Sequence, residues 1–127
     1  MRLTLLLLAG LSTVQAAEPT GTLTLACEGT EQHRKERLEP YGEPDAISMG
    51  IIINFANRTV EFAQFKYPTM QITDVTETTI FFYGSDSSVL LFGTIDRILG
   101  TVEAEYRGPL MAASSFSLKC KPTQRMF

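Results

Sequence analysis

The chain has 127 residues and a net charge of −3, from 14 acidic and 11 basic side chains. This length corresponds to one domain, and a hydrophobic content of 44% is enough to build one apolar core. The acidic balance excludes the basic face that nucleic-acid binding requires, so we predict no nucleic-acid partner.

The first sixteen residues have the pattern of a secretion signal. Arg2 gives a positive start, residues 3–11 form a short apolar run, and Val14-Gln15-Ala16 fits a small-x-small cleavage site. We predict a signal peptide at 1–16 and a single β-domain at 17–127, in the periplasm or secreted. The apolar run is too short to cross a bilayer as a helix, so we predict no membrane span.

Two cysteines, Cys27 and Cys120, lie near opposite ends of the domain. Each continues an alternating pattern, in which Leu23 and Leu25 share a face with Cys27, and Leu118 shares a face with Cys120. If both faces point into one core, the first and last strands are neighbours and a structural disulfide joins them. Two free buried thiols are the alternative. Two distant cysteines and a single histidine are a poor ligand set, so we predict no metal.

Alternating apolar and polar residues, separated by short turn signals, predict strands along the whole domain. The predicted strands are, in chain order, 20–27, 47–55, 60–65, 70–75, 78–84, 89–95, 101–106 and 114–120. No amphipathic helix is evident, and the short connections favour antiparallel neighbours. We predict an all-β fold of about eight antiparallel strands in a meander, as a small barrel or a two-sheet sandwich.

The best-defined unit is the hairpin at 89–106. Its first arm is almost wholly apolar or β-branched, and its second alternates strictly. Asp96 is suited to begin the turn, and Gly100 to adopt a positive φ. Arg97, beside Asp96, has two interpretations, as a clamp on a neighbouring loop or as a cation presented to an anionic partner.

Residues 28–45 break the strand pattern, since they are charged, nearly free of apolar residues and closed by two prolines. We predict a long, flexible, solvated loop. Long loops on rigid β-scaffolds often carry binding sites. The candidate contact surface is therefore His33, Arg34, Lys35 and Tyr41, with Arg97 as a further candidate.

No catalytic constellation is evident. The single histidine, His33, falls in the predicted loop, and no nucleophile elbow is present. Glu103 and Glu105 are two apart on one strand, roughly 6–7 Å between side chains, a spacing that suits glycosidase carboxylates but is more typical of a solvated strand face. We predict no catalytic residues and no cofactor, and we expect the protein not to be an enzyme.

The run Gly93-Thr-Ile-Asp-Arg97 with Gly100, the ending Leu118 to Phe127, and the cysteine of Leu25-Ala-Cys27 resemble small exported proteins of uncharacterised function from α-proteobacteria such as rhizobia. The resemblance implies a periplasmic or secreted setting and no particular activity. The chain is more weakly similar, in size and disulfide plan, to periplasmic lysozyme inhibitors, which are small β-barrels. Their active-site-plugging motif is not evident.

The sequence therefore favours a non-enzymatic exported β-domain that binds a protein or small molecule through loops at one end. The alternatives are a structural envelope protein without a ligand, and a periplasmic inhibitor of a hydrolase such as lysozyme. The interior and the surface of the fold distinguish the ligand classes. An apolar cavity would favour a small molecule, whereas a filled core with an exposed aromatic patch would favour a protein.

Overall fold

The computed structural model describes residues 20–36, 38–64, 67–109 and 112–123. These residues form eight strands, which confirms the predicted all-β class. The predicted signal peptide and the last four residues of the chain lie outside the described residues. The strands are β1 (Thr22–Arg34), β2 (Asp45–Asn54), β3 (Thr59–Phe62), β4 (Met70–Val75), β5 (Thr79–Asp86), β6 (Val89–Asp96), β7 (Thr101–Arg107) and β8 (Ala113–Pro122).

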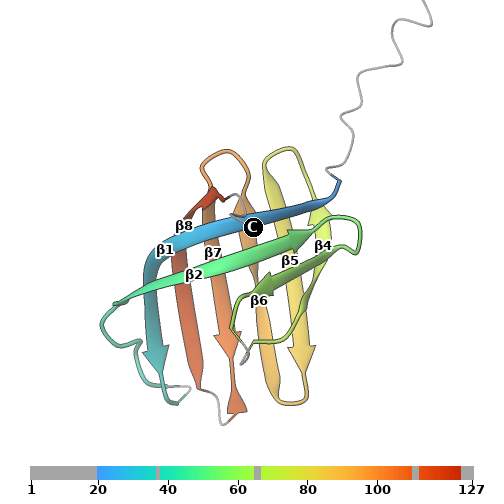
Figure 1. Cartoon of the computed structure of the whole chain (residues 1–127). Coiled ribbons are helices and arrows are strands. Elements are labelled where there is room, and N and C mark those ends of the chain that lie inside the picture. Colours follow the sequence, from blue (N-terminus) through green and yellow to red (C-terminus); the bar gives the residue numbers. More distant parts are fainter. Residues whose placement is uncertain (1–19, 37, 65–66, 110–111, 124–127) are drawn as a thin grey trace, which may run out of the picture.

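The sheet is a closed antiparallel meander, in which each strand pairs with the next and β8 returns to β1. This closure decides for the barrel over the sandwich. In Figure 1, β1 to β3 cross in front of β5 to β8, and the long β1 bends so that it belongs to both layers. The pairing is uneven around the ring. β1 and β8 are in register from Leu25↔Pro122 to Arg34↔Ala113, whereas in the described part of the chain β3 and β4 share two register pairs, Thr59↔Gln71 and Val60↔Met70.

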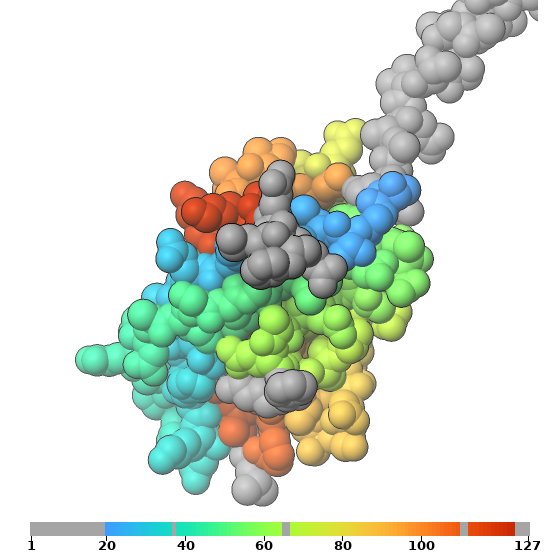
Figure 2. Space-filling model, viewed as in Figure 1, coloured from blue at the N-terminus to red at the C-terminus, as the bar shows by residue number. Residues whose placement is uncertain are grey.

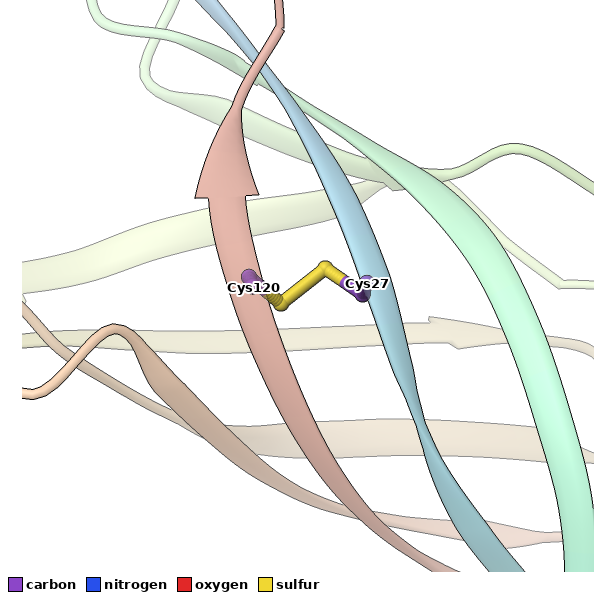
Figure 3. The surroundings of a disulfide bond; sticks show 2 residues. All are labelled: Cys27 and Cys120. Carbon is purple, nitrogen blue, oxygen red and sulfur yellow. A yellow bond between two sulfur atoms is a disulfide. The ribbon is translucent and has the colours of Figure 1, made fainter.

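The predicted disulfide is present. Cys27 and Cys120 are register partners on β1 and β8, and their sulfur atoms are bonded across the seam where the ring closes (Figure 3). The bond connects residues that are 93 positions apart in the chain. The prediction that both cysteines continue the inward faces of their strands is confirmed, because Leu25, Cys27 and Leu118 are all buried.

Side chains from all parts of the ring fill the barrel interior. The largest fully buried ones are Phe116, Ile51, Ile53, Met70, Leu91, Val60 and Val102. The buried Phe62 ring packs edge-on to Phe82 and Phe116, at 6.0 Å between centroids in each case. Burying each such side chain stabilises the fold by about 1.5–3 kcal/mol, and edge-to-face rings fix their relative positions.

The predicted loop at 28–45 is wrong for residues 28–34. β1 continues to Arg34, paired with β8 along this whole extension, and also with β2 as far as Glu31↔Asp45. Backbone pairing therefore keeps residues 28–34 in a strand, although these residues show no hydrophobic alternation. The connection is 35–44, and it folds back on β1, since the Gly42 N–H donates to the His33 carbonyl at 2.7 Å. It forms the lower left corner of the molecule in Figure 2.

The turn prediction for the β6–β7 hairpin is confirmed. Asp96 Oδ1 accepts hydrogen bonds from the backbone N–H groups of Ile98 at 2.9 Å and Leu99 at 2.8 Å. Gly100 has a φ of 71°. Arg97 clamps this turn to the β4–β5 turn, because its Nη1 donates to the Thr76 carbonyl and its backbone N–H donates to the Thr78 carbonyl at 2.7 Å.

Candidate functional site

The five predicted contact residues do not form one surface. His33 and Arg34 end β1, and Lys35 and Tyr41 belong to the connection that follows. Arg97 lies in the β6–β7 turn, at the opposite end of the barrel, because the register aligns Arg34 with Ala113 and Arg107 at the far end of that hairpin. The loop-clamp interpretation of Arg97 agrees with its contacts to the β4–β5 turn.

The connection 35–44 contacts the outer wall of the barrel through Tyr41. The Arg34 guanidinium lies over the Tyr41 ring at 4.9 Å, and the Tyr41 hydroxyl donates to Glu105 Oε1 on β7 at 3.2 Å. Partial burial raises the pKa of Tyr41, and the Glu105 charge and hydrogen bond raise this pKa further. The hydroxyl therefore stays protonated and acts as a donor.

From Glu105 the same outer face continues across β7, β6 and β5. The Arg107 side chain binds Glu105 Oε2, at 2.8 Å from Nε and 2.6 Å from Nη2, and its guanidinium lies 5.3 Å from the centre of the Phe92 ring. Phe92 is the register partner of Tyr83. Tyr83 is 48% exposed and Phe81, on the same strand face, is 37% exposed.

These residues form a continuous outer surface, which we call the aromatic stripe. Its members are Arg34, Tyr41, Glu105, Arg107, Phe92, Tyr83 and Phe81. A shallow groove of about 520 Å³ runs along its β5–β6 half, between Phe81, Tyr83, Leu90 and Phe92. Two arginines held over aromatic rings, with a carboxylate between them, make a surface that presents both apolar area and fixed charge.

A second group of polar residues lies on the inward face at the end of β1. Glu31 is only 8% exposed, and its Oε1 is 3.4 Å from His33 Nε2. His33 Nδ1 is 2.8 Å from Ser114 Oγ on β8. Glu31 Oε2 is buried without a hydrogen-bond partner in the described part of the chain. Burial raises the pKa of the nearby Tyr67 hydroxyl, and the charge of Glu31 raises it further.

The order carboxylate, imidazole, hydroxyl is that of acyl-transfer enzymes, but the surroundings of Ser114 do not suit that chemistry. Ser114 is 6% exposed. It lies within β8 between two paired strands, opposite His33 on one side and Tyr106 on the other. Ser114 is therefore almost fully enclosed by its neighbours. The cluster brings three polar side chains together at the end of an apolar interior.

Glu103 and Glu105 share the outer face of β7, as the alternation indicates, but they have separate partners. Glu103 Oε1 accepts from Ser117 at 2.9 Å, whereas Glu105 binds Tyr41 and Arg107. Sequence reasoning missed Arg107, Phe92, Tyr83 and Phe81 as surface residues. One signal was available, because aromatic residues that alternate with core positions must face outward if nothing covers the sheet.

No family model, curated protein or solved structure matches this chain. Within the described residues, no helix is both long and apolar enough to cross a membrane. In the same part of the chain, no three or more His, Cys, Asp or Glu side chains come together as a metal site would require. The geometry of the surface is therefore the basis for assigning a function.

Proposed function

We propose that this protein is a non-enzymatic, exported binding module that recognises a protein partner through the aromatic stripe. The observation that carries the proposal is the combination of a packed barrel centre with exposed aromatic side chains on the outer wall. Isoleucine, methionine, leucine and phenylalanine side chains occupy the barrel centre, while Tyr83 and Phe81 present apolar area to solvent. A patch of this kind marks a site of protein association.

The chemical character of the stripe supports a protein partner. Tyrosine and arginine are the residues that dominate binding energy in protein interfaces, where rigid aromatic rings add contact area at little entropic cost. Tyr41, Tyr83, Arg34 and Arg107 supply both types. Each arginine is already positioned over a ring, so less side-chain freedom is lost when a partner binds.

The export part of the proposal rests on Cys27–Cys120 and on the predicted signal peptide at 1–16. A disulfide persists in oxidising compartments and is rare in the cytosol. We infer a periplasmic or secreted location. In that setting a partner on the envelope or outside the cell has access to the stripe.

Site-specific photo-crosslinking tests the proposal. A photoreactive phenylalanine analogue replaces Tyr83 in one variant and Ile98 in the matched control. Ile98 is apolar and 73% exposed, but lies in the β6–β7 turn at the other end of the barrel. We expect the Tyr83 variant to crosslink one envelope or secreted protein, identified by mass spectrometry, and the Ile98 variant not to.

A second set of variants tests whether the stripe supplies the affinity. With the partner identified, and without the photoreactive residue, Tyr83→Ser and Arg107→Ala should each weaken its non-covalent binding at least tenfold, and Leu99→Ser, at a residue 67% exposed in the same turn as Ile98, should not. Equal crosslinking from Tyr83 and Ile98, or none from either, would contradict recognition by the stripe. The second result would favour a structural envelope protein without a ligand.

A further inference from the structure

A small apolar pocket opens at the end of the barrel that carries the β4–β5 and β6–β7 turns. Its volume is about 260 Å³, and inward-facing side chains of β1, β2, β5 and β6 form most of its wall, together with one residue of the β2–β3 turn. The strand residues are Leu23, Leu25, Ile53, Ile80 and Ile95, and the turn residue is Phe55. Deeper in the barrel Ile51 and Val60 are fully buried in the packed core, so the pocket is a closed-ended mouth. It lies at the opposite end from the 35–44 connection and is separate from the proposed protein interface.

Asp96 and Arg97 of the β6–β7 turn lie at the rim of this pocket. The two side chains differ in how many of their hydrogen-bonding atoms already have partners. Asp96 Oδ1 accepts two backbone hydrogen bonds within its own turn. Arg97 is exposed and is held in place by the Thr76 carbonyl through Nη1. A guanidinium has five N–H donors in a planar fork, so a fixed cation with further donors stands beside an apolar pocket.

We propose that this mouth binds one straight-chain carboxylate of about eight carbons, with its hydrocarbon chain in the pocket and its head on Arg97. At about 30 Å³ for each water-sized group, a volume of about 260 Å³ accommodates roughly eight or nine such groups. This is the size of one medium chain and is too small for a two-chain lipid. Guanidinium binds carboxylate with two parallel hydrogen bonds, and apolar pockets with one positioned polar group are typical of ligand sites in barrel mouths.

Calorimetric titration of sodium octanoate into the purified, disulfide-bonded protein tests this site. We expect one octanoate to bind saturably with a Kd below about 1 mM. Octyl glucoside and octyltrimethylammonium should bind at least tenfold more weakly. The neutral and cationic compounds share the chain and differ in the head group. Equal affinity for all three, or no saturation by octanoate up to 10 mM, would overturn the proposal.

Two variants locate the ligand. Arg97→Gln should weaken octanoate binding at least tenfold and leave octyl glucoside binding unchanged, and Leu23→Trp, which fills the mouth, should abolish both. Lys119→Gln is the matched control, because it removes one positive charge from the exposed face of β8, and it should bind octanoate normally. Octanoate binding that survives Leu23→Trp would contradict occupancy of this mouth.

Discussion

Glu31 and His33 lie two residues apart on β1 and contact each other on the inward face of the barrel, with 3.4 Å between Glu31 Oε1 and His33 Nε2. The pair joins a buried carboxylate to an imidazole that is about half exposed. The other carboxylate oxygen of Glu31 has no hydrogen-bond partner among the described residues. His33 thus supplies a polar contact to a carboxyl group that is buried beside an apolar interior.

The first prediction concerns this pair. His33→Ala should lower the free energy of unfolding by about 1–2 kcal/mol, because it removes a polar contact of the buried Glu31 carboxyl group. In a Glu31→Leu background the same substitution should cost much less, and Glu31→Leu alone should be neutral or stabilising, since it removes the buried polar group. Urea denaturation of the four proteins gives the coupling energy. Additive effects would show that the two side chains do not interact.

The second prediction follows from Tyr67. Its pKa is raised in the folded protein by burial, and to a lesser extent by the charges of Glu31 and Tyr106. Below about pH 10 the hydroxyl is protonated in both states and adds no pH dependence. Above pH 10 the unfolded chain loses this proton while the folded protein keeps it, so the free energy of unfolding should fall by up to about 1.4 kcal/mol per pH unit.

Tyr67→Phe provides the control for that slope. Denaturation of the wild type and of Tyr67→Phe is measured between pH 8 and about pH 11.5, with the disulfide intact. We expect the two curves to be parallel below pH 10 and the wild type to decline more steeply above it. The same slope in both proteins would mean that Tyr67 is not responsible.

The third prediction concerns the disulfide. Cys27 and Cys120 close a loop of 93 residues, and a loop of that length stabilises by about 4–5 kcal/mol in the chain-entropy model, although measured losses are often 2–5 kcal/mol. The double variant Cys27→Ser/Cys120→Ser should lose free energy of unfolding in that range. Calorimetry or urea denaturation measures the loss. A change below about 0.5 kcal/mol would show that backbone pairing of β1 with β8 alone holds the seam.

The fourth prediction compares alanine substitutions at two glycines on neighbouring strands. A Cβ at Gly29 would overlap the Ser117 carbonyl and lie 2.8 Å from Leu118 Cα, so Gly29→Ala requires a backbone shift of β8. We expect a loss of about 2–3 kcal/mol. At Gly50 the nearest atom is Ala63 Cβ at 3.5 Å, an ordinary contact, so Gly50→Ala should change stability by less than about 1 kcal/mol. Equal losses at both positions would contradict the close approach of β1 and β8.

Alternation alone was enough to predict most of the fold. Leu23, Leu25 and Cys27 mark an inward face by their spacing, and the eight predicted strands correspond to the eight observed. Alternation does not reveal the last part of β1, because the inward positions of that part are Gly29, Glu31 and His33, none of which is apolar. Hydrophobic periodicity identifies a strand only where its inner face meets the core, and β1 extends beyond that region to the end of the barrel.

The candidate site was less predictable. Arg34 and Tyr41 were identified as contact candidates because they lie near a charged connection. Their link to Glu105, Arg107 and Phe92 depends on the curvature that brings β1 and its loop against β7. The sequence shows apolar residues on both faces of β5, which suggests a strand covered on both sides. The barrel is a single sheet, and among the described residues no second layer lies over the outer face of β5, so Phe81 and Tyr83 are exposed.

The short register between β3 and β4 determines where the ring is weakest. Among the described residues, Thr59↔Gln71 and Val60↔Met70 are the register pairs of this seam, supplemented by the Ile72 N–H donating to the Arg58 carbonyl at 2.8 Å, whereas the disulfide fastens the seam between β1 and β8. Native-state hydrogen exchange should therefore be fastest for amides of β3 and slowest beside Cys27 and Cys120. If the barrel opens transiently, β3 and β4 should separate first, while the disulfide keeps β1 and β8 together.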